Sequence, residues 1–308
     1  MKKNQINKNF LHANDFSKDK LAEILNKAEW IKKKITEDNN YKPFIGKTMA
    51  MIFAKPSART RISFETGFYK LGGHAIYLGP NDIGIGKRES VSDIAKVISR
   101  FNDIIMARLF KHQHILELAE SASIPVINGL TDFNHPCQII ADLFTIKEKL
   151  GRFDDFTISY IGDGNNIVHS WLELSMIIPF KLNIVCPENF CPDMKLLELA
   201  SKKGISEICL EHDPYLGVKN SDIIYADVWA SMGKKEEGEA RQKIFKPYQV
   251  NKKLFRTTNK KTLFMHCLPA ERGVEVTDEI CDADYSIIFD QAENRMHAQN
   301  AIVLDLLS

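Results

Sequence analysis

The chain has 308 residues, a length typical of about two domains and sufficient for a sizeable buried core. Its composition, with 44% hydrophobic and 26% charged residues, excludes a disordered chain. The net charge of +1 excludes a general attraction to nucleic acid or to a membrane surface, so neither is expected as a partner and any anion site must be built locally.

The cysteines and the hydropathy pattern indicate a reducing compartment. Six cysteines occur without a CxxC pair or a dense framework, which favours free thiols in a cytoplasmic protein. The first residues lack the apolar core of a secretory signal, and no run approaches the roughly 18 apolar residues of a membrane span. No HExxH motif and no Cys/His spacing typical of zinc occurs, so the sequence predicts no metal site.

Short β-branched runs alternate with amphipathic runs along the first half of the chain. After an opening helix at 17–36, strands are expected at 48–54, 74–79, 103–109 and 124–130, with helices at 58–71, 90–101 and 112–122 between them. A longer helix follows at 135–151, with Pro136 in its first turn and Gly151 at its end.

The alternation then resumes, which indicates a second sheet. Further strands are expected at 157–163, 181–186, 205–211, 222–229, 261–269 and 285–292. The sequence therefore predicts an α/β fold of two domains, residues 1–135 and 136–292, each a parallel sheet flanked by helices and linked by the helix at 135–151. The last helix, 293–308, could return to either half, and we assign it to the first domain.

An unusual run, Ser57-Ala58-Arg59-Thr60-Arg61, lies where the first strand passes into a helix. Such a turn presents backbone N–H groups at the positive end of the helix dipole, and each arginine adds a planar fork that fits phosphate. The run therefore predicts a phosphate site. The alternative is a capping serine followed by two arginines that face solvent.

Other polar residues also follow strands of the first half. Arg108 ends an apolar strand, where it could also be a surface cap. His135 and Gln138 share one face at the beginning of a helix and could both reach a ligand carbonyl, although His135 could be only a cap. Because ligands bind at the carboxyl ends of strands in open α/β sheets, we expect these side chains to lie near one site.

The second half offers a different set of polar residues. IGDGNN at 161–166 partly matches a dinucleotide fingerprint, but Ile167 replaces its third glycine, and its aspartate and asparagines could equally bind an amino acid. Asp227 ends a strand and could hold an amine, while Cys267 could be a nucleophile, a polar contact or an inert thiol. The polar run 231–240 is either a solvated loop or a lid that closes over a site.

Five motifs, taken together, resemble one family over nearly the whole chain. They are SARTR at 57–61, HPCQ at 135–138, DVWASMG at 227–233, HCLPAERGVEVTDE at 266–279 and FDQAENR at 289–295. The chain resembles the aspartate/ornithine carbamoyltransferase family, and its DVWASMG motif resembles the branch that uses ornithine. The resemblance implies transfer of the carbamoyl group from carbamoyl phosphate to the side-chain amine of L-ornithine, giving L-citrulline and phosphate without a cofactor.

The resemblance also assigns roles to individual residues. The implied carbamoyl phosphate ligands are Ser57, Ala58, Arg59, Thr60, Arg61, Arg108, His135, Gln138, Cys267, Leu268 and Arg295. The implied ornithine ligands are Asn166, Asp227, Ser231 and Met232. Arg59, Arg108 and His135 would polarise the carbonyl, and Asp227 and Cys267 would position a neutral amine; these five are the expected catalytic residues.

Two positions depart from the family pattern. Ala58 replaces a common threonine, which removes a hydroxyl but keeps the backbone N–H. Gly84 stands where relatives often carry a polar residue that reaches carbamoyl phosphate in a neighbouring subunit, and Lys87 could substitute for it. The family implies a homotrimer with sites at subunit interfaces, and a place in arginine synthesis or in arginine breakdown.

Alternative functions are a carbamoyltransferase that uses putrescine, acylated ornithine or aspartate, and an NAD-dependent oxidoreductase. The SMG and HCLP motifs favour free ornithine over the other acceptors, and an oxidoreductase would leave SARTR unexplained. A non-catalytic amino-acid sensor would be expected to have lost Arg59, His135 or Cys267, and all three are present.

Overall fold

The computed structural model describes residues 8–37, 40–85, 89–229, 238–258 and 260–308. Contacts between residues divide the chain into two compact units, Met1–Phe144 with Glu293–Ser308, and Thr145–Ala292. The sequence places the first division at the beginning of helix α6 (Pro136–Leu150), and the contacts place it within that helix.

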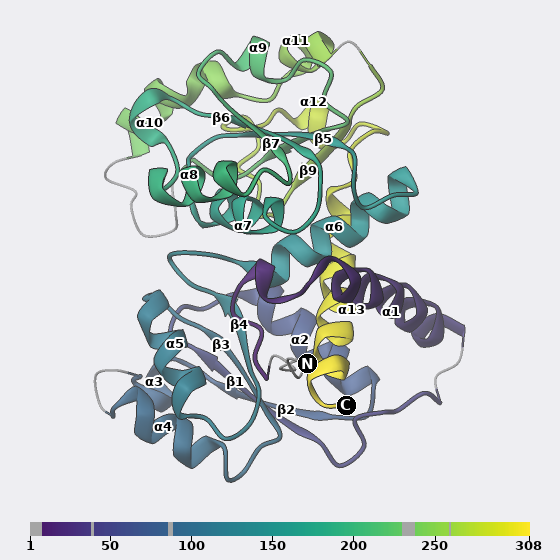
Figure 1. The fold of residues 1–308 in the computed structure, drawn as a ribbon, viewed down its shortest axis with the longest axis vertical. Helices are drawn as coiled ribbons and strands as arrows, with labels where there is room; N and C mark the ends of the chain where they lie inside the picture. The colour runs from purple at the N-terminus through teal and green to yellow at the C-terminus, as the bar shows by residue number, and fades with distance from the viewer. Residues whose placement is uncertain (1–7, 38–39, 86–88, 230–237, 259) are drawn as a thin grey trace. The chain divides into compact units, whose positions relative to one another are not determined.

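The first unit contains a parallel sheet of four strands in the order β2-β1-β3-β4 (Figure 1). The strands are β1 (Thr48–Phe53), β2 (His74–Leu78), β3 (Ile104–Arg108) and β4 (Val126–Leu130). Helices α4 (Val91–Ile98) and α5 (His112–Ser121) cover one face of this sheet. The burial of alternate strand residues against them, such as Ala50 and Ile52 from β1, builds the core on that face.

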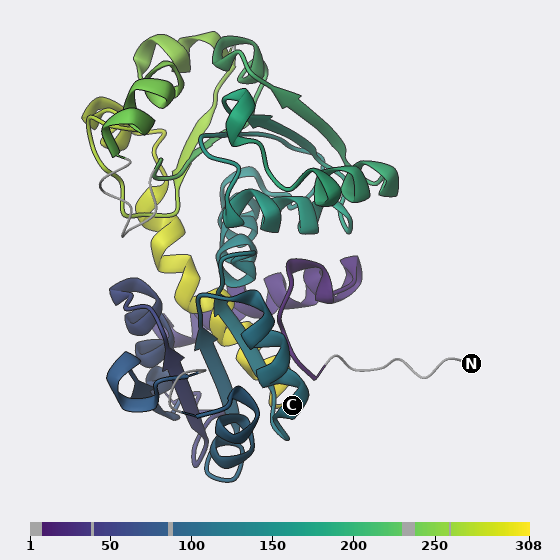
Figure 2. The ribbon, with the colours of Figure 1, turned by 90° about the vertical axis from the view of Figure 1, so that its left-hand side faces the viewer.

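The other face of this sheet carries α1 (Lys18–Glu37), α2 (Ala58–Lys70) and the C-terminal helix α13 (Ile288–Leu306), drawn in yellow in Figure 1 and from the side in Figure 2. Asp305 accepts hydrogen bonds from Lys20 at 2.7 Å and from Lys27 at 2.8 Å, which ties α13 to α1. Asn300 donates to the carbonyl of Gly67, whose missing side chain allows α13 to approach α2. The last helix therefore packs on the first unit, as expected.

The second unit contains a parallel sheet of five strands in the order β7-β6-β5-β8-β9. The strands are β5 (Thr157–Ile161), β6 (Lys181–Val185), β7 (Glu207–Glu211), β8 (Ile223–Ala226) and β9 (Leu263–His266). Helices α7 (Asn166–Ser175) and α8 (Met194–Lys203) cover one face (Figure 1). The remaining helices of this unit are α9 (Pro214–Gly217), α10 (Gly238–Phe245), α11 (Lys252–Phe255) and α12 (Asp278–Cys281).

One expected strand is wrong. Residues 285–292 form only an isolated bridge between Ser286 and Phe264, and α13 begins at Ile288. The β-branched pair Ile287 and Ile288 suggested a strand. Both side chains are buried, but they lie where the chain leaves β9 and enters α13. The two parallel sheets flanked by helices are otherwise confirmed. Among the described residues, no helix combines the length and apolar character that crossing a membrane requires.

Candidate functional site

The first group of candidate residues lies at the beginning of α2. Ser57 is the N-cap of this helix, with an extended backbone, and its hydroxyl accepts from the backbone N–H of Thr60 at 3.3 Å. A serine in this position satisfies one of the free N–H groups of the first turn. The remaining N–H groups form the positive end of a helix of 13 residues, which attracts an anion. Ala58 is exposed and adds no polar side-chain atom.

Thr60 brings two arginines from distant parts of the chain to this helix terminus. Its hydroxyl oxygen is fully buried and accepts from Arg108 Nη1 at 3.3 Å and from Arg295 Nη2 at 3.0 Å. Arg108 is the last residue of β3, as the sequence predicts. Arg295 lies within α13, which begins at Ile288 where the sequence predicts a strand at 285–292.

His135 belongs to the same group. It is 4% exposed, and burial together with the charges of Arg295 and Arg108 lowers its pKa well below 6.5. The imidazole is therefore neutral at physiological pH and can donate only one hydrogen bond to a ligand. Gln138, one turn later in α6, is held by the carboxylate of Asp142 at 2.8 Å.

Arg59 and Arg61 differ although only Thr60 separates them. The Arg61 guanidinium is tied to Glu65 at 2.9 Å and lies 4.1 Å from the Tyr77 ring centroid, on the exposed side of α2. Within the described part of the chain, Arg59 has no hydrogen-bonding or ion-pair partner for its side chain, so its guanidinium is available to an anion. Residues two positions apart lie about 200° apart around a helix axis and so point to different sides, which explains the difference.

Asp227 is the centre of the second group, which lies in the second unit. One carboxylate oxygen accepts from Asn165 Nδ2 at 2.7 Å. The other accepts from the Cys267 thiol at 3.0 Å and from the backbone N–H of Val228 at 2.8 Å. Asp227 directly follows β8 and Cys267 directly follows β9, so neighbouring strands bring the expected carboxylate and thiol together.

The segment after β9 is held in an uncommon backbone conformation. Leu268 has a φ of 58°, a left-handed value that a leucine adopts only when its surroundings impose it. The backbone N–H of Leu268 donates to His266 Nδ1 at 2.9 Å, and Nε2 of the same ring lies 3.2 Å from Glu275. His266 is fully buried, and its ring holds the backbone of Leu268 in place.

Two residues of this group, Asn165 and Arg241, are absent from the ligands that the resemblance implies. Asn166, the expected ornithine ligand, is the first residue of α7, but Asn165 before it contacts Asp227. Arg241 donates to Asp163 at 2.5 Å and to the backbone carbonyl of Trp229 at 2.8 Å. The carboxylate of Asp163 in IGDGNN signals a cationic partner, but nothing in the spacing identifies Arg241.

Some expected positions lie outside the described residues. Ser231, Met232 and Lys87 are among them, as is most of the polar run 231–240. Gly84 is described; it ends the short helix α3 (Pro80–Ile83) with a φ of 54°, a value that glycine adopts at little cost.

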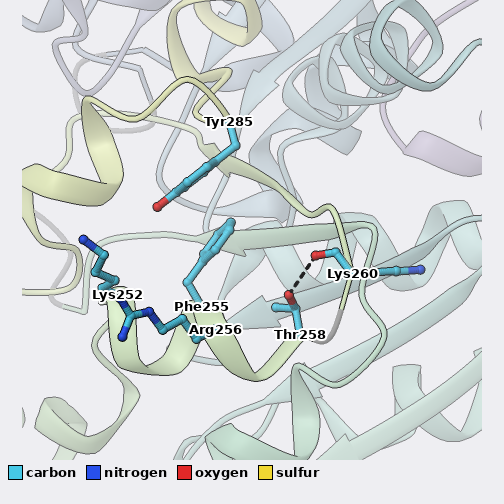
Figure 3. Close-up of a pocket in the computed structure, with 6 residues that line it drawn as sticks. All are labelled: Lys252, Phe255, Arg256, Thr258, Lys260 and Tyr285. Carbon is cyan, nitrogen blue, oxygen red and sulfur yellow. Dashed lines mark hydrogen bonds between the residues drawn. The ribbon is translucent and has the colours of Figure 1, made fainter.

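A surface pocket on the second unit contains none of the expected residues (Figure 3). Its lining residues are Lys252, Phe255, Arg256, Thr258, Lys260 and Tyr285. The rings of Phe255 and Tyr285 stack with centroids 4.3 Å apart. Lys252 pairs with Glu279 and Lys260 with Asp222, so neighbouring carboxylates already neutralise two of its three cations. The pocket therefore does not resemble an anion site.

Comparisons with known proteins match both units. Residues 8–148 match the family model described as aspartate/ornithine carbamoyltransferase, carbamoyl-P binding domain, and residues 154–306 match its Asp/Orn binding domain. The chloroplastic ornithine carbamoyltransferase of Pisum sativum is 59% identical over 301 residues, which are 97% of this chain and 80% of the relative. The ornithine carbamoyltransferase of Thermococcus kodakarensis is 48% identical over 292 residues, covering 94% of this chain and 93% of the relative.

The solved structures agree with the sequence relatives. The ornithine carbamoyltransferase of Pyrococcus furiosus superimposes with a TM-score of 0.91 and 44% identity, over 96% of this chain and 95% of that one. That of Campylobacter jejuni, described as anabolic, gives a TM-score of 0.90 and 37% identity, over 97% and 98% of the two chains.

Proposed function

The chain belongs to the aspartate/ornithine carbamoyltransferase family, and we propose that it transfers the carbamoyl group of carbamoyl phosphate to the side-chain amine of L-ornithine. The products are L-citrulline and phosphate. The observation that carries this assignment is the similarity to ornithine carbamoyltransferases over nearly the whole chain, together with a cluster of cations at the beginning of α2.

We assign carbamoyl phosphate to the first unit. The N–H groups at the beginning of α2 and the guanidinium of Arg59 suit the phosphate dianion. Arg108, Arg295 and the neutral imidazole of His135 supply further donors, and Gln138 on the same helix as His135 can add an amide. Donors aimed at an oxygen that gains negative charge accelerate such reactions by roughly 10²–10³ each.

We assign ornithine to the second unit. The Asp227 carboxylate offers a negative charge to an amine, and Asn165 and Cys267 fix its two oxygens. Asn166, Ser231 and Met232 are the further proposed contacts of the amino acid, and Cys267 and Leu268 those of the carbamoyl group. Asp227, Arg59, Arg108, His135 and Cys267 are the proposed catalytic residues.

The reaction needs no external co-reactant. The neutral side-chain amine forms a bond to the carbamoyl carbon and gives a tetrahedral intermediate. That intermediate expels phosphate as the C–O bond breaks, and the amine loses its extra proton to the departing phosphate. Carbamoyl phosphate is itself an activated acyl donor, so the chain's residues need only bind, orient and stabilise charge.

An NAD-dependent oxidoreductase fits the structure poorly. In a dinucleotide site, the glycines of the turn leave room for a pyrophosphate against the backbone. Here the backbone of Cys191 and Pro192 fills that room, since a side chain at Gly164 would lie 2.3 Å from the Pro192 nitrogen. The N–H of Gly164 donates to the carbonyl of Phe190 at 2.8 Å and is not available to phosphate.

Citrulline formation from carbamoyl phosphate tests the proposal directly. Ornithine, putrescine, acetylornithine and aspartate should be compared as acceptors at matched concentrations. We expect product with ornithine and far less with the other three. Comparable activity with another acceptor would overturn the assignment of the second unit, and no product with any acceptor would overturn the function.

We further propose a homotrimer with sites at subunit interfaces. The family resemblance suggests this assembly, and two exposed apolar side chains of the first unit support an interface. Ile62 and Tyr69 of α2 are 62% and 76% exposed and line a hollow with Ala75 of the edge strand β2. Sedimentation equilibrium should give the mass of three chains, and Tyr69→Glu should shift it toward one chain. A wild-type mass of one chain would contradict the proposal.

A cytoplasmic or similarly reducing compartment is also part of the proposal. All six cysteines are free thiols, and none forms a disulfide. Cell fractionation against marker proteins tests this, and recovery of the chain in an oxidising compartment would contradict it.

A further inference from the structure

Two cysteines and a histidine gather at one edge of the second sheet, outside the proposed substrate residues. Cys186 follows β6, Cys191 follows the short turn Glu188–Phe190, and His212 follows the neighbouring strand β7. One ligand atom from each lies within 4.8 Å of those of the other two. The sequence shows no familiar zinc spacing, because four residues separate the cysteines and the histidine comes from the next strand.

The distances fit a tetrahedral metal ion. The sulfurs of Cys186 and Cys191 lie 3.9 Å apart. A zinc ion with Zn–S bonds of about 2.3 Å and tetrahedral angles holds two sulfurs about 3.8 Å apart. A disulfide requires an S–S distance of about 2.05 Å, so the two sulfurs are not bonded to each other. The Cys186 thiol donates to the Cys191 sulfur and the Cys191 thiol donates to the carbonyl of Glu188, and zinc binding would release both thiol protons.

The histidine is prepared to act as a ligand. His212 Nδ1 lies 2.7 Å from the backbone carbonyl oxygen of Cys186, which can only accept, so Nδ1 carries the proton of the neutral ring. The lone pair of Nε2 then remains for a metal, and a ring N–H bound to a carbonyl is the usual support of a metal-binding histidine. Cys191 is half-buried and His212 is exposed, which leaves a route for an ion and for a water ligand.

We propose that Cys186, Cys191 and His212 form a binding site for one Zn²⁺ ion, with water as the fourth ligand. Two thiolates neutralise the charge of the ion, and sulfur with imidazole selects zinc over magnesium or calcium. Neither the family assignment nor the proposed reaction requires this ion, so the site can be tested without any measurement of carbamoyl transfer.

The ion would stabilise a loop that supports the ornithine residues. The segment between the two cysteines packs against Gly164, the neighbour of Asn165, through the carbonyl of Phe190. The Phe190 ring also lies 4.7 Å from the guanidinium of Arg241. Because zinc binds only the folded arrangement of its ligands, saturation should raise the Tm of the full chain.

Zinc uptake by the full-length protein tests the site. The chelator-treated chain is kept anaerobic, incubated with excess Zn²⁺, desalted and analysed for zinc per chain. We expect one equivalent, with an increase in Tm. Substituted Co²⁺ should give the near-UV thiolate band and the intense visible band of a tetrahedral site. Cys191→Ser should lose the retained zinc, the thiolate band and the increase in Tm, and His212→Gln should reduce all three.

Two cysteine variants serve as controls. Cys209→Ser removes another half-buried thiol, and Cys267→Ser removes the thiol beside Asp227, which could itself attract zinc. Both should retain one equivalent. The proposal is overturned if the wild type retains no zinc, if Cys191→Ser retains as much as the wild type, or if Cys267→Ser alone loses it. Oxidation of Cys186 and Cys191 to a disulfide without zinc uptake under the same conditions would also overturn it.

Discussion

The guanidinium of Arg295 donates to the hydroxyl of Thr60 at 3.0 Å, although 235 positions separate the two residues in the chain. Arg108 donates to the same oxygen at 3.3 Å. One buried hydroxyl therefore orients two guanidinium groups beside the positive end of α2. A bound dianion would offset the repulsion between these charges, and we therefore propose that the arrangement is prepared for phosphate before a ligand arrives.

Thr60→Val tests this arrangement, because valine keeps the shape of threonine and removes the oxygen. We expect kcat/KM for carbamoyl phosphate to fall roughly 10- to 100-fold, which corresponds to the loss of one or two hydrogen bonds to charged groups. The KM for ornithine should change little. Thr66→Val, a change of the same kind later in α2, is the control for helix stability. Equal behaviour of the two variants would show that the hydroxyl has no orienting role.

Arg59→Ala should reduce turnover at least ~10²-fold, because the change removes both a phosphate ligand and a donor to the carbonyl. Steady-state kinetics with saturating ornithine measures this. Arg100→Ala, at an exposed arginine of the same unit, is the control for a general loss of positive charge. Near-normal turnover of Arg59→Ala would remove this residue from the mechanism.

Arg61→Ala should behave differently from Arg59→Ala. The guanidinium of Arg61 is tied to Glu65 and Tyr77 on the exposed side of α2, so its loss should cost less than about fivefold in kcat/KM. A loss as large as that of Arg59→Ala would mean that Arg61 leaves Glu65 to bind the ligand.

The sequence predicts which ends of strands carry the proposed site residues, because short apolar runs locate β1, β3, β8 and β9 and the polar residues lie at or just after their ends. It cannot predict which of two polar residues that are close in sequence faces the proposed site. Arg59 and Arg61, or Asn165 and Asn166, are equivalent in composition, and only the rotation of each helix about its axis separates them. The order of strands was also not predictable, and it is this order that places Asp227 beside Cys267.

The last predicted strand shows a second limit of prediction from the sequence. Residues 285–292 have the β-branched content of a strand, yet α13 begins at Ile288. Tertiary contacts decide this region, since Gln291 in α13 accepts from the backbone N–H of His266 at 2.9 Å and so joins the helix to β9. Local propensity contains no information about that contact.

Asp227→Asn should raise the KM for ornithine and reduce kcat/KM at least ~10²-fold, because the amide removes the negative charge that attracts the amine. It also turns an acceptor of hydrogen bonds from Asn165 and Cys267 into a partial donor. The dissociation constant of carbamoyl phosphate, measured by calorimetry, should stay near the wild-type value. Asp222→Asn, at a carboxylate of the same unit that pairs with Lys260, is the control. A weaker affinity for carbamoyl phosphate without a change for ornithine would reverse the assignment of Asp227.

The buried imidazole of His135 should make the stability of the chain depend on pH. The folded protein keeps His135 neutral, since burial, Arg295 and Arg108 lower its pKa well below 6.5, whereas the unfolded chain takes up a proton near pH 6.5. Below that pH the unfolded state binds more protons, so the free energy of unfolding falls as the pH drops toward the folded pKa. Between pH 6.5 and 5.5 this residue should contribute roughly 1 kcal/mol of the loss.

Urea unfolding of the wild type and of His135→Gln measures this contribution. The free energy of unfolding should fall less in the variant between pH 6.5 and 5.5. The two proteins should behave in parallel between pH 7.5 and 8.5, where the histidine is neutral in both states. An equal loss in both proteins below pH 6.5 would mean that the folded protein accepts the proton at His135, and the neutral imidazole would then have to be removed from the proposed mechanism.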